Sequence, residues 1–410
     1  MIDKLKQFDA LILVSLIWFL AKFVRYAFPP LFGPLQSAYG VSNSILGTAF
    51  TSFMIIYALM QFPSGVIADS IGSIRVVAAG VAVAGVGALS LFFDLNFGFL
   101  IAAMLVIGAG TGVHKTVAIR LITRIYSNRP GRALGIHDTF GSFGGVAAPS
   151  LVVVFLSAPA SLSIFFDIMP ESNWRGVFLL TGIAGLFLSS TFIIQNRRKP
   201  FFDTDGATVD SSNGSSTSLL DYVTLFSDAR FVVFVIATTG FSFAHNGLVA
   251  FLPLYLSQVS ELSNTTASLL YSIFFWVTFV QLLTGDISDR FGRMLLMAIM
   301  GVTATAAMWG IVFLPNAGIV LLGSLIAFVG VGAHGFQPIR GAYLMNHLPD
   351  HLSGGGLGIV RTLLMGIGAL APVIVGITAD ILNFRVAFGV LAAVVAVSTI
   401  GLIGLWVVEK

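Results

Sequence analysis

Long apolar runs alternate with short polar connections along almost the whole chain. Each run holds roughly 20 residues, which is the length that a helix needs to cross the hydrocarbon core of a bilayer. Membrane β-barrels show alternating segments of about ten residues, and these do not appear. The pattern predicts an all-α integral membrane protein with twelve transmembrane helices, at about 10–30, 44–64, 76–93, 97–118, 133–156, 175–195, 231–256, 265–284, 294–314, 318–340, 356–379 and 386–408.

Composition agrees with this pattern. Of the 410 residues, 57% are hydrophobic and 10% are charged, and the mean hydropathy is +0.96. A soluble domain carries about 25% charged residues. The absence of cysteine excludes disulfides, thiolate metal sites and cysteine nucleophiles. The sequence shows no phosphate-binding Gly-Lys-Ser/Thr loop and no His-Glu-x-x-His. We therefore expect no enzyme, no cofactor, no metal site and no nucleic-acid partner.

One polar cassette occurs in both halves of the chain, each time between two apolar runs. A tight polar turn between two membrane helices fits this placement, with glycines that permit close backbone approach and a carboxylate that faces a helix end or an arginine. A duplicated turn implies a duplicated domain. The two copies read Gly65-Val66-Ile67-Ala68-Asp69-Ser70-Ile71-Gly72-Ser73-Ile74-Arg75 and Gly285-Asp286-Ile287-Ser288-Asp289-Arg290-Phe291-Gly292-Arg293.

Other matches between the halves support the duplication. Gly145 and Pro149 match Gly368 and Pro372, and the strings 133–136 and 356–359 match at the same offset. We predict an N-terminal six-helix bundle over 1–195, a cytoplasmic linker over 196–230 and a C-terminal six-helix bundle over 231–410. Small residues permit close helix packing in membranes. That role is expected for the glycines of the fifth and eleventh helices, namely Gly141, Gly144, Gly145, Gly366 and Gly368.

The basic residues of the loops predict the orientation, because positive charge favours the cytoplasmic side. With a cytoplasmic amino terminus, only Arg175 and Arg385 lie outside. We therefore expect a multi-pass protein of the cell membrane with both termini in the cytoplasm. The inner side would hold Lys4, Lys6, Arg75, Arg120, Arg124, Arg129, Arg132, Arg197, Arg198, Lys199, Arg230, Arg290, Arg293 and Lys410.

The spacing G-x-x-x-D-x-x-G-x-x-R resembles the signature loop of the major facilitator superfamily. The first copy has Ser70 and Ser73 where basic residues are usual, whereas the second keeps Asp289-Arg290-Phe291-Gly292-Arg293. The resemblance implies a monomeric secondary transporter whose two six-helix halves rock about a site near the midplane of the membrane. It also implies that the loops act in gating, through Gly65, Asp69, Gly72, Arg75, Gly285, Asp289, Arg290, Gly292 and Arg293.

Ionisable residues inside the predicted helices are mostly basic. Each is expensive in lipid unless it faces a cavity or a partner. The bases are Lys22, Arg25, Lys115, Arg340 and Arg361, and Asp138 is the acid. Because the chain does not neutralise these bases, we expect the missing negative charge to belong to a bound anion.

In the superfamily the first, fourth, seventh and tenth helices line the central cavity. In this chain those helices carry the expected substrate-binding residues Lys22, Arg25, Tyr26, His114, His245, Asn246, His334, Gln337 and Arg340.

The string Phe23-Val24-Arg25-Tyr26-Ala27-Phe28 is similar to the first helix of the organic phosphate and anion:cation symporter families. In those families an arginine at the place of Arg25 holds the substrate anion. Organophosphate porters have a second arginine where this chain has His245, so a carboxylate is favoured over a phosphate ester. Alternatively, Arg25 snorkels to the outer surface, since a helix break is expected at Pro29-Pro30.

Ion coupling is predicted at Asp138, His137 and Arg361, with the proton as the coupling ion, because histidine changes charge near neutral pH. Arg361 aligns with Asp138 between the halves. The two residues could form a pair between the halves, or each could bind a local partner, such as Arg120 for Asp138. Buried histidines could instead bridge helices by hydrogen bonds.

The favoured function is secondary active transport of a small organic anion, driven by protons or by exchange. One alternative is an exporter of drugs or amphipathic metabolites with the same fold, for which the 37 phenylalanines would permit an aromatic pocket. Another is a transporter-like membrane sensor, which would bind the anion without moving it.

Overall fold

The computed structural model describes residues 2–93, 95–126, 130–157, 174–198, 225–347 and 353–409. These residues form α-helices and short 3-10 helices joined by turns, as the apolar runs predict. Within these residues, twelve helical segments are long and apolar enough to cross a membrane. The all-α, twelve-span prediction is therefore confirmed.

The chain divides into two compact units. The first contains Met1–Val41, Thr48–Ala207 and Ser263–Ser272, and the second contains Ser42–Gly47, Thr208–Leu262 and Ile273–Lys410. Most of the predicted linker, residues 199–224, lies outside the described residues. The boundaries expected at 195 and 231 thus stay a prediction.

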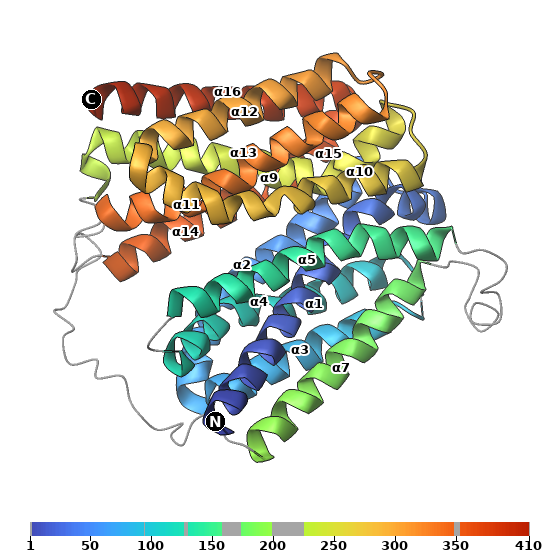
Figure 1. Cartoon of the computed structure of the whole chain (residues 1–410). Coiled ribbons are helices and arrows are strands. Elements are labelled where there is room, and N and C mark those ends of the chain that lie inside the picture. The colour runs from blue at the N-terminus through green and yellow to red at the C-terminus, as the bar shows by residue number, and fades with distance from the viewer. Residues whose placement is uncertain are drawn as a thin grey trace. The chain divides into compact units, whose positions relative to one another are not determined.

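The first unit is built around α1, which packs against α3, α4, α5 and α7 (Figure 1). The hydrophobic core beside α1 is formed by aliphatic side chains of α1, α3 and α4, such as Val14, Val77 and Val117. The helices of this half of the chain are α1 (Ile2–Tyr39), α2 (Asn43–Ile71), α3 (Ser73–Ser90), α4 (Phe97–Ile125), α5 (Pro130–Leu156) and α7 (Arg175–Arg198).

In the second half, two predicted helices are interrupted. The run at 265–284 becomes α10, the 3-10 turn η3 and α11, and the run at 356–379 becomes α14 and α15. Pro372 explains the second break, because it has no N–H to continue the helical ladder. The elements are η2 (Leu225–Ser227), α9 (Ala229–Gln258), α10 (Asn264–Trp276), η3 (Val277–Phe279), α11 (Val280–Phe291), α12 (Arg293–Phe313), α13 (Ile319–His347), α14 (Ser353–Ala369), α15 (Ala371–Ile381) and α16 (Phe384–Glu409).

The helix break expected at Pro29-Pro30 is wrong. Helix α1 continues through Pro29, Pro30 and Pro34 to Tyr39. Membrane helices tolerate proline where neighbouring groups satisfy the freed backbone carbonyls. Arg25 consequently lies in the body of a long helix and not beside its end.

Glycines bring α1 and α5 together. A Cβ atom at Gly141 would collide with the indole of Trp18, and one at Gly144 would collide with the backbone of α1 at Phe19. The expected close packing is thus present at both positions. In the second unit Gly368 packs closely on α9, but Gly366 is exposed with nothing near its Cβ position. The packing role expected for Gly366 is wrong, because its side of α14 faces away from the neighbouring helices.

The duplication is also visible in how each unit packs. On α4, a Cβ at Gly110 would lie 2.5 Å from the carbonyl oxygen of Gly80 on α3. On α13, a Cβ at Gly332 would lie 2.6 Å from the carbonyl oxygen of Met300 on α12. The same glycine-mediated contact between corresponding helices therefore occurs in both halves of the chain.

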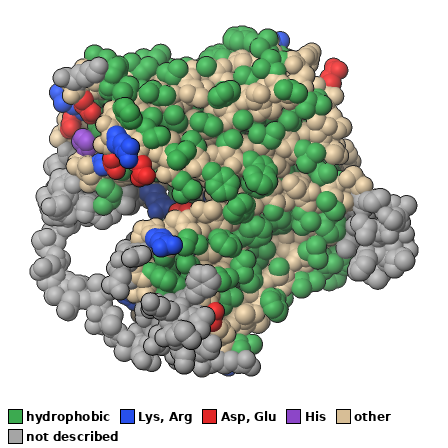
Figure 2. All heavy atoms as spheres, in the orientation of Figure 1, with side chains coloured by type: hydrophobic (Ala, Val, Ile, Leu, Met, Phe, Trp, Pro, Cys, Tyr) green, Lys and Arg blue, Asp and Glu red, His purple; other side chains and the backbone are tan. Residues whose placement is uncertain are grey.

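On the visible face of each unit, hydrophobic side chains cover far more of the surface than charged ones do (Figure 2). In the unit that contains α16, the visible charged side chains gather mostly toward the end at which that helix finishes. Apolar flanks with charge near the helix ends are what a membrane-spanning protein requires.

Candidate functional site

The two polar turns have nearly the same backbone. Gly72 has φ 93° and Gly292 has φ 97°, and each lies between the end of one helix and the start of the next. Positive φ values are readily adopted by glycine and strained for other residues. Gly65 and Gly285 lie inside helices with open space at their Cβ positions. The close backbone approach expected at Gly65 and Gly285 is therefore absent, and the turns depend on Gly72 and Gly292.

Each turn also holds its carboxylate against an arginine. Asp69 pairs with Arg120 of α4, whereas Asp289 pairs with Arg293 at 3.1 Å, one helical turn further along. Arg293 also donates to the carbonyl oxygen of Ala342 at 3.1 Å. Arg75 caps the end of α2 through Ile71 O at 3.4 Å, and Arg290 is exposed. The two copies thus share a backbone but differ in their ion pairs.

Three rings from three helices meet in the first unit. The Trp18 indole of α1 stacks on the imidazoles of His114 from α4 and His137 from α5, with ring centroids 5.5 Å and 5.8 Å away. The two imidazoles are 5.4 Å apart. Both histidines are almost fully buried, at 1% and 0% exposure. We call Trp18, His114 and His137 the Trp–His cluster.

Two ammonium groups and one carboxylate surround the Trp–His cluster. Lys22 Nζ lies 5.1 Å and Lys115 Nζ lies 4.8 Å from the Trp18 ring centroid. Lys115 donates to the carboxylate of Asp138 at 2.5 Å. Asp138 therefore has a local partner, but that partner is Lys115 and not the expected Arg120, which pairs with Asp69.

A second cationic group lies one turn further along α1. Lys22 Nζ donates to the phenol oxygen of Tyr26 at 3.3 Å. The Arg25 guanidinium lies over the rings of Tyr26 and Tyr57, at 5.5 Å and 5.6 Å. Tyr26 and Tyr57 are both buried. Arg25 thus contacts aromatic side chains inside the first unit. The sequence had left open the alternative that it extends to the outer surface.

The second unit has its own pair of histidines. His245 of α9 and His334 of α13 lie 6.1 Å apart and both contact the ring of Phe274. Gln281 of α11 lies 3.4 Å from Nδ1 of His334. In α9, Asn246 donates to Ser242 O at 2.8 Å. Gln337 is half-buried one turn beyond His334.

Two arginines of the second unit lie near each other. Arg340 of α13 and Arg361 of α14 are close enough for their charges to interact, and both are half-buried. Among the described residues, neither arginine forms an ion pair, and neither does Lys22. In the part of the chain that the structure describes, each unit therefore holds at least one half-buried cation without an ion pair.

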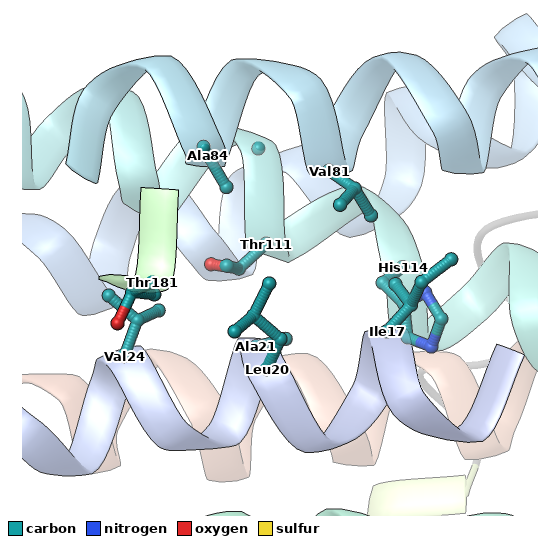
Figure 3. A pocket seen from close by; sticks show the side chains of 11 residues that line it. Ile17, Leu20, Ala21, Val24, Val81, Ala84, Thr111, His114 and Thr181 are labelled. Atoms are coloured by element: carbon teal, nitrogen blue, oxygen red, sulfur yellow. The ribbon is translucent and has the colours of Figure 1, made fainter. Parts of the chain in front are cut away.

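A small cavity in the first unit lies between α1 and its neighbouring helices (Figure 3). Its walls come from α1, α3, α4 and α7, and its volume of about 20 Å³ is enough for the centre of roughly one water molecule. Most of the lining is aliphatic. Its polar groups are His114, Thr111 and Thr181, whose side chains are labelled in Figure 3.

Five contact residues were not among the predicted site residues: Trp18, Tyr57, Lys115, Phe274 and Gln281. Trp18 had a detectable signal, because it lies at helical spacing from Lys22 and Tyr26 on α1. Tyr57 and Gln281 belong to helices outside the predicted cavity set, and only the fold brings them to Arg25 and His334.

Comparison with known proteins gives a family and several distant relatives. The family model described as Major Facilitator Superfamily matches residues 14–370. A chloroplast protein of Arabidopsis thaliana, "Probable anion transporter 6", is 27% identical over 57% of this chain and 45% of its own length. A protein of Staphylococcus aureus (strain COL), whose name assigns it provisionally to proline/betaine transport, is 27% identical over 58% of this chain and 47% of its own. The matched region thus spans about half the length of these relatives.

Solved structures share the whole fold. A bacterial homologue of the human lysosomal transporter Spinster, in an inward-facing and unoccupied conformation, has a TM-score of 0.75. The match covers 98% of this chain and 95% of that chain at 16% identity. At this identity the likeness concerns the fold alone. With the family match over most of its length and twelve membrane-spanning helical segments, the chain belongs to the major facilitator superfamily of multi-pass membrane transporters.

Proposed function

We propose that this protein is a secondary active transporter that moves a small organic anion, of carboxylate type, by alternating access. The observation that carries the proposal is the excess of positive charge inside both units. Asp138 is already paired with Lys115, whereas Lys22, Arg340 and Arg361 form no ion pair among the described residues. A charge buried in a low-dielectric interior is costly without a partner. An anionic substrate supplies that partner.

In the first unit, Lys22 and Arg25 form the proposed anion-binding group. They lie one turn apart on α1, and both contact Tyr26. A guanidinium can hold a carboxylate through two parallel hydrogen bonds, and an ammonium adds a compact point charge. Lys22 donates to the Tyr26 phenol oxygen at 3.3 Å. A bound anion would either replace this oxygen as the acceptor or accept a second hydrogen bond from Lys22.

In the second unit, the proposed contacts are mainly neutral donors and acceptors. His245, Asn246, His334 and Gln337 present imidazole and amide groups, and Arg340 with Arg361 adds positive charge. A phosphate ester carries close to two negative charges at neutral pH. We favour a carboxylate because α9 has His245 at the place where organophosphate porters have a second arginine.

The relatives support this class without naming the substrate. One is named as an anion transporter, and the other is assigned to proline and betaine. Proline and betaine both carry a carboxylate group. A carboxylate is an anionic group that proline and betaine contain, so it is compatible with both names and with the cationic groups of this chain.

The remaining roles are part of the same proposal. Asp138, His137 and Arg361 serve ion coupling, with the proton as the coupling ion or with exchange as the alternative. The two polar turns act in gating. The protein works as a monomer in the cell membrane, with both termini in the cytoplasm and six-helix halves over 1–195 and 231–410 joined by a linker over 196–230.

The test is uptake into proteoliposomes of radiolabelled acetate, lactate, succinate, glycerol 3-phosphate, proline and betaine. We expect at least one carboxylate to accumulate when the lumen is alkaline. Arg25→Gln and Lys22→Gln should each lower that uptake by tenfold or more, as the loss of a charge-assisted contact implies. Arg124→Gln is the matched control, because Arg124 is an exposed cation at the end of α4.

Other outcomes identify the alternatives. Uptake that is equal in Lys22→Gln, Arg25→Gln and wild type removes these two residues from the substrate site. Resistance of expressing cells to lipophilic compounds, without anion uptake, identifies an exporter. Saturable anion binding without flux identifies a sensor.

A further inference from the structure

We propose that His114 and His137 form one proton-binding site, and that this site takes up the coupling proton together with the anion. This inference rests on the proposed transport function and assigns its proton to the imidazole pair. Within the proposed ion-coupling group, Asp138 holds Lys115, and the two imidazoles bind the proton itself.

The two imidazoles are placed to share a proton. Their ring centroids are 5.4 Å apart. In an N–H···N hydrogen bond of about 2.9 Å, two imidazole rings in line have centroids roughly 5 Å apart. Rotation of the rings about their side-chain bonds is therefore enough to bring a nitrogen of His114 against a nitrogen of His137. A proton held between them would form a charge-assisted hydrogen bond.

Both rings have unused hydrogen-bonding groups in the present state. Nδ1 and Nε2 of His114 and of His137 are buried and have no hydrogen-bond partner. Leaving a buried polar atom unsatisfied costs about 1–3 kcal/mol. Histidines that only bridge helices would have these bonds in place. Two adjacent histidines without them instead point to a site whose bonds form in another protonation state.

The surrounding charges explain why such a proton would arrive with an anion. Lys115 from α4 and Asp138 from α5 act on the pair directly, while Lys22 from α1 lies over the Trp18 ring of the same cluster and donates to Tyr26. Lys115 and Asp138 neutralise each other, and Lys22 remains. A protonated imidazole would thus add to uncompensated positive charge, which opposes its formation.

An anion bound at Lys22 and Arg25 removes that opposition. Lys22 contacts both the Trp18 ring and Tyr26, so it connects the Trp–His cluster with the proposed anion-binding group. Binding of the anion lowers the positive potential at the imidazoles, and binding of the proton in turn favours the anion. Such reciprocal coupling is what a proton symporter of an anion requires.

The small cavity gives His114 a second polar neighbourhood. His114 lines it together with Thr111 and Thr181 (Figure 3). The two hydroxyls donate to backbone carbonyls and keep lone pairs free to accept. A water molecule in this space could bond to His114 and to both hydroxyls, since a buried water needs two to four polar partners. The cavity thus has room for a water molecule that accepts a hydrogen bond from protonated His114.

Trp18 provides a direct measurement, because an imidazolium beside an indole quenches its fluorescence. A protein with Trp18 as its single tryptophan is made by replacing Trp174, Trp276, Trp309 and Trp406 with Phe. Its fluorescence in detergent should fall through one transition as the pH is lowered. The most active anion of the uptake panel should move the midpoint of that transition to higher pH.

Matched variants assign the transition to the pair. His137→Gln and His114→Gln should each abolish it, whereas His347→Gln, at the end of α13, and Asp138→Asn should retain it. If the single-tryptophan protein with all its histidines shows no transition, the proposal is overturned. This measurement does not depend on whether the His114 and His137 variants fold. A transition that survives His137→Gln and His114→Gln, or disappears in Asp138→Asn, also overturns it.

A transport measurement separates this inference from the proposed function. With His114→Gln and His137→Gln together, accumulation driven by a pH gradient should be lost, while His347→Gln should accumulate the anion like the wild type. If wild-type protein moves no anion at all but Trp18 reports the histidine-dependent transition, the proton site stands and the transport proposal fails. If accumulation driven by the pH gradient is unchanged in the double variant, the proton is carried elsewhere.

Discussion

The carboxylate of Asp138 on α5 accepts a hydrogen bond from Nζ of Lys115 on α4 at a distance of 2.5 Å. This single contact decides the charge balance of the first unit. Asp138 is the acid that the sequence places among the buried bases, and the pair neutralises it. Lys22 is therefore left for an external anion, and the imidazoles of His114 and His137 are left for the proton.

The strength of the Lys115–Asp138 pair can be measured with a double-mutant cycle. Lys115→Met, Asp138→Asn and the double variant should show a coupling energy of about 0.5–1 kcal/mol. The value is modest because the Asp138 side chain is 53% exposed and water screens the pair. Thermal or denaturant unfolding in detergent gives the four stabilities. A coupling energy of zero would mean that the two charges do not interact in solution.

Gly141 should not tolerate a larger residue. The Cβ of Gly141→Ala would collide with the Trp18 indole, so we expect a loss of about 1–3 kcal/mol and a change in Trp18 fluorescence. Gly135→Ala on the same helix is the control, because nothing lies near its Cβ position. Equal melting temperatures for the two variants would contradict the close contact between α1 and α5.

The glycines of the polar turns should separate into two classes. Gly72→Ala and Gly292→Ala place a side chain at φ 93° and 97° and should each cost roughly 1–2 kcal/mol. Gly65→Ala and Gly285→Ala lie in open space within helices and should stabilise by up to about 1 kcal/mol. Melting temperatures in detergent test the signs. A destabilised Gly65→Ala would show that this position is packed against something after all.

The second unit offers a parallel comparison on α14. A Cβ at Gly368 would lie 2.7 Å from Nδ2 of Asn246 and 2.9 Å from Oγ of Ser242. Gly368→Ala should therefore displace the Asn246 amide and reduce anion uptake, whereas Gly366→Ala should leave uptake near the wild-type level. Initial uptake rates at several substrate concentrations provide the test. Indistinguishable rates would remove Asn246 from the substrate contacts.

Much of the fold could be predicted from the sequence, because the length and hydropathy of an apolar run identify a membrane-spanning helix. The spans, the repeat and the two polar turns all come from local patterns. The run of prolines in α1 was misleading, since proline indicates a helix break in water but is tolerated where neighbouring helices satisfy the carbonyls. The breaks within the eighth and eleventh helices were not predicted, because hydropathy does not register a local change in helix geometry.

The site was predictable in its residue types but not in its contacts. The sequence identifies the buried bases and histidines, because such residues are rare in apolar helices. It does not show which of several nearby cations reaches Asp138, since Arg120 and Lys115 lie on the same helix and only the rotation of α4 against α5 decides. The meeting of Trp18, His114 and His137 has the same origin, because it needs three helices to come together.

Binding of carboxylates to the purified protein tests the central claim most directly, because a ligand that binds only the folded state raises its stability. We predict that at least one carboxylate of the uptake panel raises the melting temperature of the wild-type protein, with a smaller or absent effect in Lys22→Gln and an unchanged effect in Arg124→Gln. If no carboxylate shifts the melting temperature, or if Lys22→Gln responds like the wild type, the buried cations are not an anion site.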